Sequence, residues 1–161
     1  MSERDATRER NYRRILALVA FDDTDTAVVR RAHGLARLEG AQLALLHLVP
    51  PETSLDGGYP PPSRRELAQG LEQAALRRMA FLKATLGVDA AELLACHGQP
   101  RQGFDACITQ WQPDLVVAGD DPGYLAGHHD LLTLGRKDRR QGRFMKLVRG
   151  LALPLGLLQG V

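Results

Sequence analysis

Short apolar runs alternate with longer segments of helical periodicity along this chain, and this alternation limits its fold more than any other feature. Residues 15–21 form an unbroken apolar run, as expected of a strand buried on both faces of a sheet. Further apolar runs predict four more strands, at residues 42–49, 91–96, 114–118 and 153–158. Strands that alternate with helices favour right-handed crossovers and a parallel sheet covered on both faces. We therefore predict an α/β fold with a five-stranded open parallel sheet and helices on both faces.

Four helices are predicted between these strands. The first begins at Thr24 or Asp25 and ends before Gly40, the second spans residues 64–86, and the third begins near Pro100. The segment that follows the fourth strand is expected to be irregular, and a fourth helix is then indicated by apolar residues at helical spacing: Phe144, Met145, Leu147, Val148 and Leu151. The element order is thus β-α-β-α-β-α-β-α-β.

The composition is that of one globular domain. The 161 residues carry a net charge of +2, but the segment from Arg136 to Arg149 holds seven bases and one acid, a local +6 that leaves −4 for the rest. This segment has few aromatic residues for base stacking, so nucleic-acid binding is not expected. The longest apolar run, seven residues, is far shorter than the roughly 18 that would cross a bilayer. We expect a flexible tail over residues 1–11, one domain over residues 12–161, and a cytoplasmic location without membrane binding.

Carboxylates follow the first and fourth predicted strands. In an open parallel sheet, ligands bind at the carboxyl ends of the strands where the connections depart to opposite faces. Asp22 and Asp23 follow one strand, and Asp120 and Asp121 follow the other. Four carboxylates could hold a magnesium ion, because hard cations take oxygen ligands. The alternative is that these aspartates cap helices and turns, as loop aspartates commonly do.

The order and detail of these segments resemble the universal stress protein family across residues 13 to 159. The matching stretches are RRILALVAFDDTD, RAHGLARLEGAQLALLHLVPP, QPDLVVAGDD and KLVRGLALPLGLL. The resemblance implies a five-stranded parallel α/β sheet, a homodimer formed through the last strand, and a role in stress tolerance or signalling. It implies no established turnover, so we expect a protein that is not an enzyme and that acts on an unknown protein client.

The resemblance also implies a nucleotide site. In family members that bind ATP, Asp22 and Val49 correspond to positions near the adenine, and a loop of pattern G-x2-G-x9-G-[ST] holds the phosphates. Gly119 matches the first glycine of this pattern, but Gly123 comes one residue late. Gly135 is followed by Arg136 in place of serine or threonine.

This departure has a physical consequence. Pro122 stands where the second glycine belongs, and it has no backbone N–H to offer a phosphate. Asp120 and Asp121 would repel a phosphate unless a cation such as magnesium intervened. We therefore expect binding of ATP with magnesium to be weak or absent.

A different class of protein shares part of this pattern. Asp23 and Asp25, followed by the strand-four acids, also resemble the motifs of magnesium-dependent haloacid-dehalogenase-like phosphatases, in which the first aspartate is the nucleophile.

The histidines and cysteines suggest no metal centre. His47 and His97 fall near the ends of neighbouring strands, but two ligands do not make a zinc site, and no resident metal is expected. His129 and its neighbours are expected in a solvated loop. Cys96 and Cys107 lack metal-ligand spacing and are expected to be small core residues.

Overall fold

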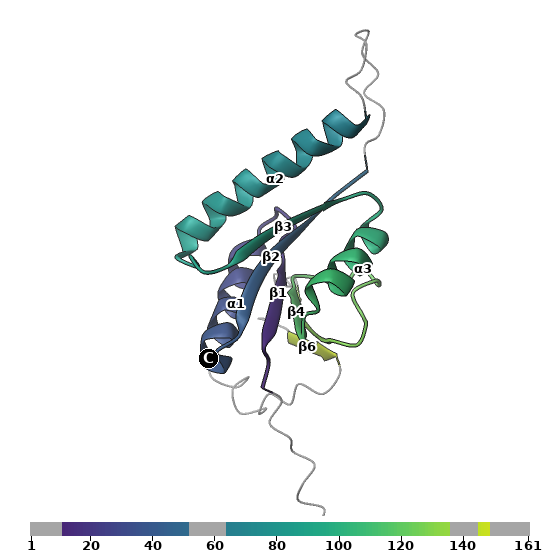
Figure 1. Cartoon of the computed structure of the whole chain (residues 1–161). Helices are drawn as coiled ribbons and strands as arrows, with labels where there is room; N and C mark the ends of the chain where they lie inside the picture. The colour runs from purple at the N-terminus through teal and green to yellow at the C-terminus, as the bar shows by residue number, and fades with distance from the viewer. Residues whose placement is uncertain (1–10, 52–63, 136–144, 149–161) are drawn as a thin grey trace, which may run out of the picture.

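The computed structural model describes residues 11–51, 64–135 and 145–148. Figure 1 shows their arrangement, in which helices pack against a twisted central sheet. The elements, in chain order, are β1 (Arg14–Leu18), α1 (Asp25–Glu39), β2 (Gln42–Val49), α2 (Arg64–Leu86), β3 (Glu92–His97), α3 (Pro100–Trp111), β4 (Leu115–Ala118), β5 (Asp130–Leu134) and β6 (Met145–Val148). Within these ranges, no helix is long and apolar enough to cross a membrane.

The strands form one sheet in the order β3-β2-β1-β4-β5-β6. The first five strands of this order are parallel to their neighbours, which confirms the predicted α/β fold with five parallel strands. β6 adds a sixth strand, antiparallel to β5, with Leu134 opposite Met145. β1 therefore lies between β2 and β4, at the centre of the parallel part of the sheet.

Alternate residues of each strand point to opposite faces and build two separate apolar cores. On one face, Ile15 and Ala17 of β1 belong to a core that includes residues of α1 and α2. On the other face, Leu16 belongs to a core with Phe104 of α3 and Leu125 of the segment after β4. Helices thus cover both faces, as predicted.

The second half of the chain differs from the prediction. The segment expected to be irregular contains β5, which is buried between its neighbours, and residues 145–148 form β6 where the fourth helix was predicted. His129 is 4% exposed and Asp130 is 7% exposed, so the solvated loop expected here is wrong. Asp130 is held at the start of β5 by its N–H bond to the Asp114 carbonyl (2.9 Å) and by the Tyr12 hydroxyl, which donates to its carboxylate (2.8 Å).

Some predictions lie outside the described residues. These are residues 1–10 of the tail predicted over residues 1–11, the proline-rich loop over residues 52–63, the basic residues 136–143 and the last strand over residues 153–158.

Candidate functional site

The carboxyl ends of β1, β2, β4 and β5 meet at one edge of the sheet, which we call the carboxyl edge. β1 pairs with both β2 and β4, and their onward connections pass over opposite faces: α1 packs in one core, and residues after β4 pack in the other. The predicted switch point therefore lies between β1 and β4. Asp22, Val49 and Gly119 lie in or directly after strands that end at this edge, and Gly135 directly follows β5.

The turn between β1 and α1 uses two of its carboxylates internally. The Asp22 carboxylate accepts hydrogen bonds from the Thr24 N–H (2.8 Å) and the Thr24 hydroxyl (2.5 Å). The Asp25 carboxylate is buried and accepts the Ala20 N–H (2.9 Å). Burial raises the pKa of Asp25, the negative charge of Asp22 raises it further, and backbone N–H bonds oppose both. These contacts support the interpretation of the aspartates as turn-forming residues.

An aromatic stack that the sequence did not predict lies beside this turn. The Phe21 ring stacks on the His47 ring with centroids 3.9 Å apart, and the Arg78 guanidinium of α2 lies 4.3 Å from the Phe21 centroid. Phe21 has a φ of +60°, a left-handed backbone conformation that bulky residues rarely adopt. Such strain is kept where surrounding contacts hold the residue, and here the stack supplies them.

His47 connects this stack to the strand. Its Nδ1 donates to the Val19 carbonyl at 2.8 Å, which places the proton of the neutral ring on Nδ1. Burial is the main cause that lowers the pKa of His47, and the nearby Arg78 charge acts in the same direction. A neutral ring, tied to the backbone and stacked on one face, is a structural group of the carboxyl edge.

The glycine loop after β4 is already in contact with the β1 turn. Gly119 is buried, and a side chain there would bring its Cβ to 3.0 Å from the Thr24 Cβ. Gly123 is exposed with a φ of +97°, and its N–H donates to the Asp121 carboxylate at 2.8 Å. Pro122 between them has no N–H. The Gly123 N–H is therefore bonded to a carboxylate of the same loop, that of Asp121.

The remaining predicted site residues are placed as follows. Val49 is buried at the end of β2, and its carbonyl accepts the Gly98 N–H at 3.4 Å. Gly135 lies partly buried after β5, and Arg136 falls outside the described residues. The carboxyl edge thus brings Asp22, Val49 and Gly119 to three adjacent strand ends.

The metal and phosphatase hypotheses gain no support from this geometry. In the part of the chain that the structure describes, no three His, Cys, Asp or Glu side chains lie close enough to hold a metal ion. Asp23 is exposed, whereas Asp25 is buried with its carboxylate bonded to backbone. A phosphatase would need that second carboxylate free to exchange a proton with the substrate.

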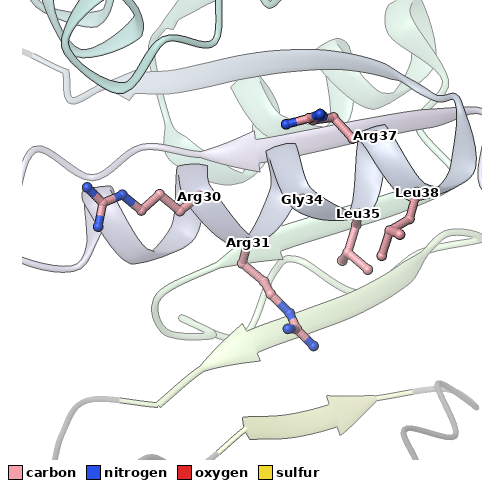
Figure 2. Close-up of a pocket in the computed structure, with 6 residues that line it drawn as sticks. All are labelled: Arg30, Arg31, Gly34, Leu35, Arg37 and Leu38. Carbon is pink, nitrogen blue, oxygen red and sulfur yellow. The ribbon is translucent and has the colours of Figure 1, made fainter.

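A hollow of about 510 Å³ lies beside α1. Figure 2 shows its lining, which comprises Arg30, Arg31, Gly34, Leu35, Arg37 and Leu38. Figure 2 shows Arg31 pointing away from Arg30 and Arg37, so the three guanidinium groups do not converge on a shared anion. We assign no site to it.

Comparison with solved structures supports the fold. The hypothetical protein MJ0577 matches with a TM-score of 0.59 at 15% identity, over 80% of this chain and 99% of that chain. The universal stress protein UspA from Lactobacillus plantarum matches with a TM-score of 0.51 at 22% identity, over 70% of this chain and 83% of that one. A universal stress protein family member from Burkholderia pseudomallei gives a TM-score of 0.51 at 18% identity, with coverages of 69% and 83%.

No curated protein matches the sequence at a significant level. The sequence profile of the universal stress protein family, however, matches residues 11–143, which is most of the chain and includes every element from β1 to β5. The chain belongs to the universal stress protein family.

Proposed function

We propose that this protein is a stress-response binding or regulatory module that does not turn over a substrate, and whose nucleotide site is weak or inactive. It would act in the cytoplasm on a protein client. Membership of the universal stress protein family supports the general role. The geometry of the loop after β4 supports the weak nucleotide site.

One observation carries this proposal. A phosphate cradle needs backbone N–H groups that point toward the ligand. In this loop, Pro122 has no N–H, and the Gly123 N–H is bonded to the Asp121 carboxylate at 2.8 Å. A phosphate would have to displace that carboxylate from the N–H, and the nearby negative charge of the carboxylate would still repel it. Hydrogen bonds to charged groups contribute about 1.5–3 kcal/mol each, so losing two such donors removes much of the affinity for phosphate.

The adenine side of the site is restricted as well. The Asp22 carboxylate already accepts two hydrogen bonds from Thr24, and Phe21 occupies the space over His47. A base that used Asp22 would compete with these contacts. Both ends of a nucleotide would therefore have to break existing interactions.

Calorimetry with ATP and magnesium tests the proposal. We expect no measurable heat from the natural protein at nucleotide concentrations up to about 1 mM, where binding would be worth only about 4 kcal/mol. The double substitution Asp121→Ala with Pro122→Gly frees one N–H and adds another. It should tighten binding by at least about tenfold, because one donor to an anion is worth more than about 1.4 kcal/mol.

The matched control is Asp89→Ala, which removes an exposed carboxylate in the turn before β3, away from the carboxyl edge. It should leave the calorimetric trace unchanged. ATP, ADP or AMP released from freshly purified natural protein, detected by mass spectrometry after denaturation, would contradict the proposal. If the double variant binds ATP no more tightly than the natural protein, the loop after β4 is not the cause of the weak binding.

We also propose that the protein is a homodimer paired through residues 153–159, which lie outside the described part of the chain. The apolar sequence of this segment and Pro154 near its start suit an edge strand that pairs with a second copy. Truncation after Gly150 should reduce the mass measured by light scattering from that of a dimer to that of a monomer, or cause aggregation. An unchanged dimer would place the interface elsewhere.

A further inference from the structure

The two cysteines of the chain lie together at the far edge of the sheet. β3 is the first strand in the sheet order and pairs only with β2 among the described strands, so it is an edge strand. Cys96 of β3 and Cys107 of α3 belong to the same apolar core, on the α3 face of the sheet. Both line one cavity of about 350 Å³, together with Leu94, Gln110 and Trp111.

A glycine explains how the helix comes close enough for this contact. Gly103 lies one turn before Cys107 on α3, so both residues face the same side. A Cβ at Gly103 would lie 3.5 Å from the Cys96 Cβ and 3.6 Å from Leu48 Cδ2. The helix backbone therefore approaches β3 directly at Cys96, which brings the next turn, with Cys107, alongside.

The two thiols affect each other's acidity, and their chemical characters differ. The neighbouring Cys107 thiol, as a hydrogen-bond donor, lowers the pKa of Cys96 to about 7, against the effects of burial and of the Glu72 carboxylate on α2. The influence of Cys96 and burial raise the pKa of Cys107. Cys107 is 4% exposed, whereas Cys96 is only partly buried.

The Glu92 and His97 side chains, which lie near the pair, do not alter the contrast between an acidic Cys96 and a protonated Cys107. The Glu92 carboxylate, at the start of β3, accepts the Trp111 Nε1–H at 3.1 Å. His97 follows Cys96 on the strand and therefore points to the opposite face. A thiolate that accepts a bond from a protonated partner thiol is the arrangement that favours nucleophilic attack by one sulfur and later closure by the other.

We propose that Cys96 and Cys107 form a peroxide-reactive dithiol that closes reversibly to an intramolecular disulfide. The Cys96 thiolate attacks one oxygen of hydrogen peroxide, so an S–O bond forms and the O–O bond breaks. The departing hydroxide takes up a proton and becomes water. Cys96 is thereby oxidised by two electrons to a sulfenic acid, and the peroxide is reduced.

The second step consumes the partner thiol. The Cys107 sulfur attacks the Cys96 sulfur, an S–S bond forms and the S–O bond breaks. The Cys107 proton leaves with the hydroxide as a second water. The net reaction is two thiols and one peroxide giving one disulfide and two waters, and an added dithiol reductant reverses the product to two thiols.

The first experiment treats the full-length natural protein with hydrogen peroxide and maps its peptides by mass spectrometry without reduction. We expect a Cys96–Cys107 linkage that lowers the mass by two hydrogens and disappears with dithiothreitol. A product linked between two chains through Cys96, or direct formation of sulfinic acid without any internal disulfide, would overturn the proposal.

Single variants test the assigned roles. With Cys107→Ala, peroxide should leave Cys96 as a sulfenic acid that dimedone captures, whereas Cys96→Ala should leave Cys107 unmodified because it is buried. The rate of Cys96 alkylation should rise with an inflection near pH 7 in the natural protein and at a higher pH in Cys107→Ala. An identical inflection in both proteins would show that Cys107 does not activate Cys96 and would overturn the assigned roles. This pH comparison uses folded protein only, which circular dichroism verifies for each variant.

Discussion

Replacing Leu125 by alanine should lower the free energy of unfolding by about 2–5 kcal/mol, the cost of removing a fully buried leucine side chain. Leu125 is 0% exposed and belongs to the same core as Phe104 of α3. It lies in residues 119–129, which connect β4 to β5 without a helix. Its side chain therefore anchors a connection that has few regular backbone bonds of its own.

Chemical denaturation followed by circular dichroism measures this effect. Leu38→Ala is the matched control, because Leu38 is 84% exposed on α1 and should change stability by less than about 0.5 kcal/mol. If the two variants lose similar amounts, residues 119–129 do not pack on the sheet as described.

The second large effect is expected at Gly119. Gly119→Ala should destabilise the protein by about 1–3 kcal/mol, because the added Cβ would lie 3.0 Å from the Thr24 Cβ and closer still to its hydroxyl. Thr24 cannot withdraw without losing its hydrogen bonds to the Asp22 carboxylate. The clash therefore disturbs the junction of the two loops at the carboxyl edge.

Gly34→Ala separates this clash from the general effect of adding a methyl group. Gly34 lies within α1, and a Cβ there would meet nothing within 4 Å. Alanine is favoured over glycine inside a helix by about 0.5–1 kcal/mol, so this variant should gain stability in the same denaturation measurement. A stable Gly119→Ala protein would mean that the loop after β4 does not touch the β1 turn.

The first two thirds of the fold could be predicted from sequence because its signals are strong and local. Residues 42–49 and 64–86 were predicted with the bounds that β2 and α2 have. The first strand was predicted to reach Phe21, but β1 ends at Leu18. The apolar run continues beyond the strand into the turn. Its last residue, Phe21, stacks on the His47 ring and does not pair in the sheet.

The predictions for the residues of β5 and β6 were wrong, and the reasons are physical. β5 begins with a buried aspartate and contains Thr133, so its sequence lacks the continuous apolar run of a central strand. The polar groups are accommodated by specific contacts, such as the Tyr12 hydroxyl on Asp130, which no local pattern reveals. β6 has four residues, too few for periodicity to separate a strand from a helix.

The strand ends that carry the candidate site residues could be predicted from the sequence, but the contacts of these residues could not. Asp22 and Gly119 follow from the rule that ligands meet the carboxyl ends of parallel strands. The close approach of Thr24 to Gly119, and the approach of Cys96 to Cys107, join different elements of the chain. The spacing of residues cannot show such contacts.

The connection from β4 to β5 has a consequence for the electric field at the carboxyl edge. In sheets whose strands lead into helices, the amino-terminal dipole of each helix places partial positive charge where a ligand binds. No helix begins between β4 and β5, so that contribution is missing on one side of the switch point. On the other side, α1 begins with Asp25 in its first turn, and Asp22 and Asp23 precede it. The helix dipole that remains is offset by carboxylates of this chain, which makes the described carboxyl edge a poor host for anions.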